Sequence, residues 1–462
     1  MGWTQERGRG GHRDLVTSHC YYLCLPGQRE VSAGVGGLLL GGPSIRLLGV
    51  SETTVSRAAP IPAPEPGLTA ETIIARAKAL IPEIRAQADE AEKAGRHTAE
   101  LDRKFVEAGF YRMLQPKRFG GYAFGMDTYW KVILAVAEGD AGTAWGLCLG
   151  AHHAQGLGAW FPEQGQIELF GPTGRFTCPH RAAPMGTATP VDGGYVVKGQ
   201  WDYCSGVGHA THFMCNTLVP GREAEGVLTV CMPIENVTVI PDWGNGNIIG
   251  MNSSGSNSVR VDNVFVPDYC TCSGNWTRNT DTAAPGMYLH DDPLFCGRIY
   301  AMYHAGLVIP VIGAAKGALH EYEQILLTKN TYFPPVVPRY TVEEYQRHYG
   351  QARALIDSAE AIILQCGQRY MELAERWHRS GEPFTREDDA AMYSMIQVAS
   401  RMAIDATNEL FGAASSSAAK RGTALQRHFR DSAIYLGHIS ARHDVVAAEV
   451  ARLHFGLPDN LF

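Results

Sequence analysis

The sequence predicts a multi-domain α+β protein in which helices come first, strands follow and helices return. Two observations carry this prediction. Apolar residues recur at helical spacing from about residue 68 to 161, and again from 301 to 454. Between these stretches, short β-branched and aromatic runs alternate with Gly, Pro and Asn turns, which is typical of a compact barrel or sandwich.

We expect four segments, with boundaries 1–66, 67–175, 176–272 and 273–462. The first lacks sustained periodicity and ends in the proline-rich run AAPIPAPEP, so we interpret it as a disordered extension or as sequence upstream of the natural start. A signal peptide is disfavoured because the apolar run at 34–40 is short and broken by glycine. The other three segments are an N-terminal helical domain, a middle β domain and a C-terminal helical bundle.

The elements of the helical domain are indicated by caps as well as by periodicity. Thr69 is a candidate N-cap, and Ile73, Ala77 and Ile84 follow it at helical spacing. A second helix is expected over 98–108, ended by Gly109. Further helices are expected over 126–138 and 142–161.

The middle and last segments follow the same logic. Strands are expected at 195–197, 213–219, 227–232, 237–240 and 259–266, and Ser205 lies in a small-residue corner between the first two. Helices are expected over 301–326, 342–380, 385–411 and 428–454.

Composition excludes several classes of protein. The net charge of −7, from 40 basic and 47 acidic residues, argues against nucleic acid or an anionic membrane as the main partner. The longest apolar run, 301–319, is interrupted by His304, Pro310 and Lys316, so we expect no membrane span. The eleven cysteines form neither a disulfide framework nor a set with zinc-ligand spacing, which favours a cytoplasmic protein with reduced thiols and no metal site. A P-loop and a Gly-x-Gly-x-x-Gly turn opening a βαβ unit are both missing from the sequence.

Four features occur together over residues 68–462. They are a W-x-x-x-S-G corner at 201–206, the run GMNSSGS at 250–256, a strand ending in Pro267, and a Q-R-x-x-R-D run at 426–431. In this order they resemble the acyl-CoA dehydrogenase fold. Within that fold, the chain is similar to the oxygenase components of two-component, reduced-flavin-dependent monooxygenases, such as hydroxylases of p-hydroxyphenylacetate and of the phenolic secosteroid of sterol breakdown.

The resemblance implies an activity. Such enzymes take reduced FMN or FADH2 from a separate NAD(P)H:flavin reductase and react it with O2. The resulting C4a-hydroperoxyflavin must be kept from water until it hydroxylates a small aromatic, phenolic substrate. The family usually assembles as homotetramers through its C-terminal helices, and we expect the same here.

The resemblance also implies site residues. His438 matches the histidine of phenol hydroxylases and would be the base that accepts the phenol proton, while Ser205 would orient the flavin or the substrate. Helical spacing places His438 two turns beyond Asp431, and Arg442 stands where relatives have an aspartate, which should lower the pKa of His438. The other expected flavin-binding positions are Trp145, His152, His180, Arg181 and Gln426, with Lys329 and Arg339 as candidates for the flavin phosphate.

Alternatives stay open. A true acyl-CoA dehydrogenase would need a catalytic glutamate, and the segment 435–440 has no carboxylate. Oxygenation at sulfur or nitrogen would make His438 a peroxide stabiliser. A helical scaffold without flavin is a non-enzymatic alternative. Without the resemblance, the Arg427–Asp431 run predicts a salt-bridged helix with histidines that perform no chemistry.

Overall fold

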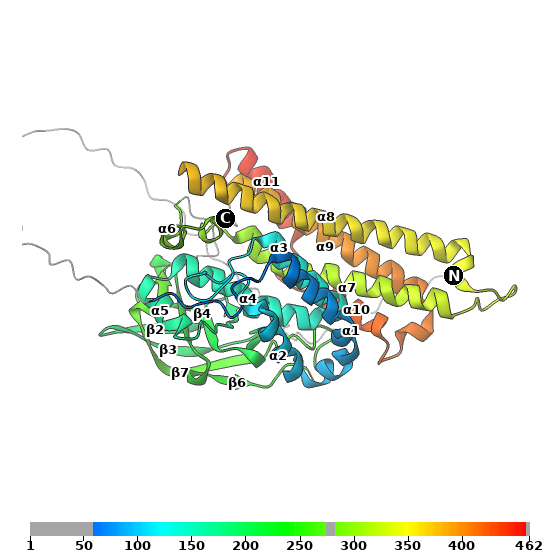
Figure 1. Ribbon diagram of the computed structural model, residues 1–462, viewed down its shortest axis with the longest axis horizontal. Coiled ribbons are helices and arrows are strands. Elements are labelled where there is room, and N and C mark those ends of the chain that lie inside the picture. Colours follow the sequence, from blue (N-terminus) through cyan, green and yellow to red (C-terminus); the bar gives the residue numbers. More distant parts are fainter. Residues whose placement is uncertain (1–58, 245, 274–281, 459–462) are drawn as a thin grey trace, which may run out of the picture. The chain divides into compact units, whose positions relative to one another are not determined.

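The computed structural model describes residues 59–244, 246–273 and 282–458. They belong to one compact unit, Ala58–Phe462. Of the extension predicted over 1–66, residues 1–58, including the apolar run at 34–40, lie outside the described residues. In its last part, Ile61 N donates to Arg118 O at 2.8 Å. Helices, strands and again helices follow one another along the unit, so the predicted α+β class is confirmed (Figure 1). The four segment boundaries stay a prediction.

The first two helices begin at threonine caps, and the expected cap at Thr69 is confirmed. Thr69 Oγ1 accepts a hydrogen bond from Thr72 N at 3.2 Å, and Thr98 Oγ1 accepts one from Leu101 N at 3.1 Å. Gly109, at φ 86°, ends the second helix in the left-handed conformation that glycine favours. These helices are α1 (Ala70–Ala94), α2 (Ala99–Ala108), α3 (Met126–Gly139), α4 (Ala141–Trp160) and α5 (Glu163–Phe170).

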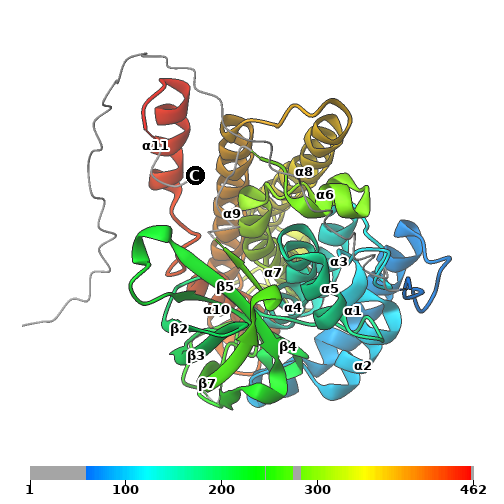
Figure 2. The same cartoon turned by 90° about the vertical axis from the view of Figure 1, so that its left-hand side faces the viewer.

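The strands pair in the order β6-β7-β3-β2-β4-β5-β8, with β1 beside β4. One parallel pair, Thr187 with Leu218, joins the two halves of this path, and in the described residues the path does not close into a barrel. Figure 2 shows the strands gathered on one side and the long helices on the other. The strands are β1 (His180–Arg181), β2 (Gly186–Val191), β3 (Gly194–Trp201), β4 (His212–Leu218), β5 (Val227–Pro233), β6 (Thr238–Ile240), β7 (Ser258–Pro267) and β8 (Thr271–Ser273).

The returning helices form a long bundle around α7. They are α6 (Pro285–His290), α7 (Tyr300–Thr328), α8 (Glu343–Ser380), α9 (Arg386–Ala413), α10 (Ala424–Tyr435) and α11 (His443–His454). The continuous helix expected over 428–454 is wrong, because residues 436–442 separate α10 from α11. Gly437 N donates to Ile434 O at 3.2 Å, and His438 N donates to Tyr435 O at 2.9 Å. These bonds span three residues, so the α-helix gives way to tight turns at Gly437, since glycine is a poor helix former.

Helix α7 is the core of the bundle and packs against α3, α4, α8, α9 and α10. Among the described residues it is the one helix with the length and hydropathy to cross a membrane. However, 83% of its most apolar stretch is buried within the fold. Its hydropathy is therefore accounted for by the protein core.

Glycine lets α3 and α7 approach closely. A Cβ on Gly313 of α7 would lie 2.1 Å from Ala137 Cβ of α3. We expect Gly313→Ala to destabilise the protein by about 2 kcal/mol, since overpacking outweighs the gain in helix propensity. Gly350→Ala on α8 is the matched control. No atom lies within 4 Å of its added Cβ, and we expect it to stabilise slightly. Urea unfolding checks both, and equal effects would contradict the packing argument.

Candidate functional site

A hydrogen bond joins α4 to the small-residue corner between β3 and β4. Trp145 Nε1 donates to Ser205 Oγ at 3.0 Å. Ser205 Oγ lies 2.6 Å from Ser256 Oγ, which lies 2.6 Å from Ser254 Oγ. Trp145 and Ser205 are 7% and 8% exposed. An indole and a chain of three hydroxyls are thus held together in a setting that contains little water.

Gly206 explains why Ser205 can come so close to α4. Its φ of 85° is strained for other residues, and an added Cβ would lie 2.6 Å from Gly146 O. Gly206 N donates to Ser254 O at 2.8 Å, so the corner also rests on the segment after β6. The backbone of this corner therefore lies directly against helix α4.

His438 meets the same tryptophan from the C-terminal part of the chain. Its ring centroid lies 5.4 Å from that of Trp145, with the rings at 79°. The prediction that His438 lies on a helix beyond Asp431 is wrong, because it lies in the loop after α10. Tyr435 holds this loop through a bond of 3.2 Å from its hydroxyl to Ser440 O.

The loop sets the protonation of His438. Ser440 N donates to His438 Nδ1 at 3.1 Å, so a neutral ring carries its proton on Nε2. The Ser440 hydroxyl in turn lies 2.8 Å from His304 Nδ1 on α7. Burial, followed by the charge of Arg181, lowers the pKa of His438 to about 4. The lowering that we expected is present, but its charged cause is Arg181 and not Arg442.

Arg181 and His180 belong to β1, next to this cluster. His180 Nδ1 lies 3.0 Å from the Tyr303 hydroxyl, and His180 Nε2 lies 3.1 Å from Asn216 Oδ1. Arg181 Nε is buried without a hydrogen-bond partner among the described residues. The charge of Arg181 acts on His438 and on Cys204, next to Ser205 in sequence. A buried donor in this region fits a flavin, whose pyrimidine edge carries carbonyl acceptors.

Two expected flavin positions lie apart from the Trp145–Ser205–His438 cluster. His152 is 1% exposed and packs edge-on against Tyr129, with ring centroids 5.7 Å apart. Gln426 Nε2 donates to Thr423 O at 2.9 Å, and its Oε1 accepts from Arg430 Nε at 2.7 Å. The Gln426 amide is therefore engaged by its neighbours, whereas both ring nitrogens of His152 are buried without a hydrogen-bond partner among the described residues. No described contact joins either side chain to Trp145, Ser205 or His438.

The Q-R-x-x-R-D helix joins three parts of the fold. Arg427 pairs with Asp89 of α1 and, at 3.7 Å, with Asp140 at the start of α4. Asp431 Oδ1 instead accepts Met251 N at 2.6 Å. The intrahelical Arg427–Asp431 salt bridge is replaced by these long-range contacts, which position the loop that follows α10.

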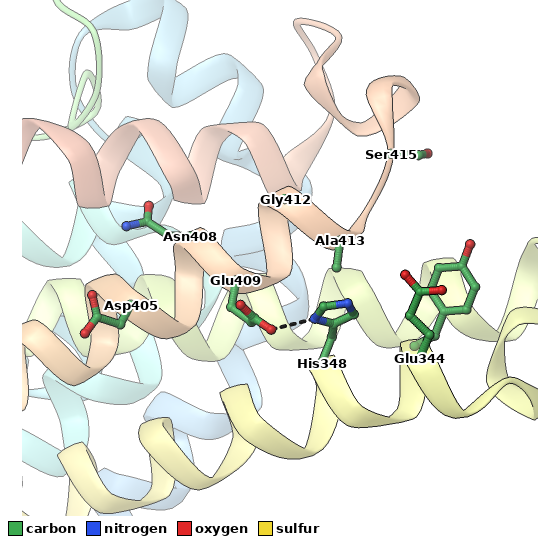
Figure 3. Close-up of a pocket in the computed structure, with 9 residues that line it drawn as sticks. Glu344, His348, Asp405, Asn408, Glu409, Gly412, Ala413 and Ser415 are labelled. Atoms are coloured by element: carbon green, nitrogen blue, oxygen red, sulfur yellow. Dashed lines mark hydrogen bonds and ion pairs between the residues drawn. The ribbon is translucent and has the colours of Figure 1, made fainter.

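The candidates for the flavin phosphate lie elsewhere. Arg339 bonds to Asn330 O at 3.1 Å and stacks on Tyr345, and Lys329 is exposed at the end of α7. The open groove nearby, between α8 and α9, has a volume of about 600 Å³ (Figure 3). Its lining includes Glu344, Asp405 and the His348–Glu409 pair, so its acidic character does not suit a phosphate.

Several residues near the Trp145–Ser205–His438 cluster were not predicted as site residues from the sequence. They are Ser254, Ser256, Tyr303, His304 and Ser440. His304 and Ser440 are 136 residues apart, and the histidine is part of an apolar helix. The signal that could have found it is the Tyr303–His304 pair, which interrupts the apolar run of a core helix.

Comparisons with known proteins bear on the fold. The family model "Acyl-CoA dehydrogenase, C-terminal domain" matches residues 305–443. The solved structure of 3-HSA hydroxylase from Rhodococcus sp. RHA1 superposes with a TM-score of 0.75, at 25% identity, covering 84% of this chain and 98% of its own. The chain has the acyl-CoA dehydrogenase fold. The predicted fold is thereby confirmed.

Relatives of this acyl-CoA dehydrogenase-fold chain are flavin-dependent oxygenases. It is 28% identical to a pigment production hydroxylase from Rhodococcus sp., covering 85% of this chain and 98% of the relative. It is 26% identical to the oxygenase subunit HsaA of a flavin-dependent monooxygenase from Rhodococcus jostii, covering 83% and 98%. The resemblance to oxygenase components is confirmed by these relatives.

Proposed function

We propose that this protein is the oxygenase component of a two-component monooxygenase, which uses reduced FMN or FADH2 and O2 to hydroxylate a small phenolic compound. The observation that carries the proposal is the meeting of Trp145, Ser205 and His438, from three distant parts of the chain, in a buried setting. The flavin, when bound, supplies the activation of oxygen.

The residues present suit that cofactor. Trp145 offers an aromatic edge, the Ser205 hydroxyl can donate or accept a hydrogen bond, and Arg181 Nε is a buried donor in need of an acceptor. Because Trp145 and Ser205 are almost fully buried, they would shield a flavin bound against them from water.

His438 is the residue that we propose to act on the reacting oxygen. Its Nδ1 accepts the Ser440 N–H, so its Nε2–H is a donor. A pKa near 4 makes the ring a weak base towards a phenol, whose pKa is about 10. These observations favour donation of a hydrogen bond over the proton abstraction that we inferred from the resemblance. A donor role does not require a phenol, so sulfur or nitrogen oxygenation is the second candidate.

The partners follow from the same proposal. Relatives that are oxygenase subunits imply a separate reductase, which delivers reduced flavin by diffusion. We propose a homotetramer, supported by apolar side chains left exposed at Tyr332, Phe333 and Val336 and on α9 at Met395 and Val398. A cytoplasmic location is supported by the free, buried state of the nine cysteines in the described residues.

The test supplies reduced FMN or FADH2 anaerobically, then oxygen-18 and a panel of phenols, thioethers and amines. We expect one labelled oxygen atom in a hydroxylated phenol, detected by mass spectrometry. Rapid-mixing absorbance should also show a long-lived band distinct from oxidised flavin. Label in a sulfoxide or N-oxide alone would select the second candidate. Peroxide release alone, together with bleaching of oxidised FAD by an acyl-CoA, would reject the proposal in favour of a dehydrogenase.

A further inference from the structure

A second cluster of chemically active side chains includes His209, which follows the Ser205 corner along the chain. It consists of His97, in the turn between α1 and α2, Asp102 on α2, and His209 at the end of the 3-10 helix η2 (Val207–His209). One ligand atom from each residue lies within 4.8 Å of the others. His97 is buried, whereas Asp102 and His209 are partly exposed, so a small ion could enter from solvent.

The distances between these atoms suit a tetrahedral ion. His97 Nε2 lies 3.3 Å from Asp102 Oδ1, and the Tyr111 hydroxyl lies 3.5 Å from His97 Nε2. Ligands at about 2.0–2.1 Å from zinc are about 3.4 Å apart along a tetrahedron edge. His209 Nδ1 is 3.8 Å from Asp102 Oδ2, so its ring would move slightly inward.

The protonation pattern is the decisive observation. His209 Nε2 lies 2.9 Å from the His97 carbonyl oxygen, which can only accept, so Nε2 carries the proton of the neutral ring. Its Nδ1 therefore presents a lone pair to the Asp102 carboxylate, and two acceptors face each other. A cation between the two atoms removes this conflict.

The surroundings match those of a metal-bound histidine. A ligating imidazole commonly donates its other N–H to a backbone carbonyl, as His209 does. The stacked rings of His97 and His209, 4.0 Å apart, keep both histidines at the same carboxylate. The Tyr111 hydroxyl donates to Asp102 Oδ1 at 2.7 Å, which orients the carboxylate.

We propose that His97 Nε2, His209 Nδ1 and Asp102 bind one divalent transition-metal ion, zinc being the best match, with the Tyr111 oxygen or water in the fourth position. Two imidazoles and one carboxylate suit zinc better than magnesium or calcium. The ion would join α2 to the residues that follow the Ser205 corner, and would stabilise the folded state by binding it alone. Arg96, whose guanidinium lies 3.1 Å from Gly208 O, places a positive charge nearby and limits the affinity.

The experiment uses the full chain, stripped with a chelator and then dialysed. Cobalt(II) is titrated and followed by its visible absorption, and zinc is measured by competition with a coloured chelator. We expect His209→Phe, which keeps a ring against His97, and Asp102→Asn each to lose one bound ion per chain. His348→Phe is the matched control, since it removes the histidine of another carboxylate pair and should leave this ion bound.

Unchanged stoichiometry in both variants, or no ion bound by the wild type, would overturn the proposal. Circular dichroism first verifies that each variant is folded. A further measurement needs no variant: X-ray absorption at the zinc edge of wild type should show only nitrogen and oxygen ligands, with imidazole scattering. A shell containing sulfur would assign the ion to cysteines instead. Zinc, but not magnesium, should raise the unfolding temperature of the wild type.

Discussion

His438→Ala is expected to lower hydroxylation of a phenol by about 100-fold or more, the usual scale for a group that handles a proton or hydrogen bond at the reacting atoms. Flavin binding should change little, because Trp145, Ser205 and Arg181 remain. Reduced flavin should still be consumed, with oxygen released as peroxide. The measurement is the ratio of product formed to flavin oxidised, with the flavin dissociation constant measured alongside.

His438→Gln separates the two roles of this histidine. The amide nitrogen of glutamine can occupy the place of Nε2 and donate, but it cannot accept a proton as a base. If donation matters, we expect the glutamine variant to keep most of the coupling that the alanine variant loses. Equal losses in both would support the base role instead. His443→Ala, five residues further along at the start of α11, is the matched control, and unchanged coupling in His438→Ala would remove the residue from the mechanism.

Acid should destabilise this protein steeply below neutral pH. The ordinary pKa of histidine is 6.5. Burial, followed by the charge of His153, lowers the pKa of His152 to about 3. Burial, followed by the charge of Arg427, lowers the pKa of His428 to about 3. As pH falls, these histidines therefore take up protons in the unfolded chain before they do so in the folded chain. Their contribution to the free energy of unfolding is complete above pH 6.5 and is lost as pH falls towards the folded-state pKa values. At about pH 5, each of the two histidines lowers the free energy of unfolding by about 2 kcal/mol relative to neutral pH, which is a large share of the stability of an ordinary protein.

The carboxyl group of Asp431 changes stability with pH in the opposite direction to the histidines. Burial, followed by the charge of Asp140, raises the pKa of Asp431 to about 7, so its contribution is lost as pH rises through that value. The histidines outnumber it, because burial also lowers the pKa of His153 to about 4 and that of His304 to about 3. We therefore expect the urea midpoint to fall between about pH 7 and pH 5.

A substitution isolates one histidine from this sum. Both ring nitrogens of His428 are buried without a hydrogen-bond partner among the described residues, so His428→Leu should be tolerated at neutral pH. It should reduce the loss at about pH 5 by about 2 kcal/mol relative to wild type. The same change at the exposed His454 should leave the pH dependence as it is. If His428→Leu keeps the wild-type pH dependence, burial of neutral histidines is not its cause.

Local chemistry made much of the fold predictable. Helix starts could be predicted because the hydroxyls of Thr69, Thr98 and Thr385 cap the backbone of the residues that follow them. Such a cap depends only on residues close together in the sequence. Strand β2 was missed because GTATPV is largely exposed and contains Gly and Pro, so it forms by pairing with β3 rather than by its own propensity. The break after Tyr435 was missed because the apolar spacing continues across Gly437.

The candidate site was predictable only in part. The resemblance indicated Trp145, Ser205 and His438, and the structure brings these three together. It also indicated His152 and Gln426, which lie among other partners. The tautomer of His438 depends on one backbone N–H in an irregular loop, and no periodicity in the sequence reports such a bond.

The separation of Trp145, Ser205 and His438 along the chain has a consequence for synthesis. Helices α1 to α4 and the sheet are synthesised before α10, and α3 and α4 complete their packing once α7 has followed the sheet. The loop that carries His438 follows α10, whose Arg427 and Asp431 dock onto residues made long before. A chain that stops before α10 therefore contains Trp145 and Ser205 but lacks His438. The Trp145–Ser205–His438 cluster is completed only near the end of translation, when α10 docks and brings His438 to Trp145.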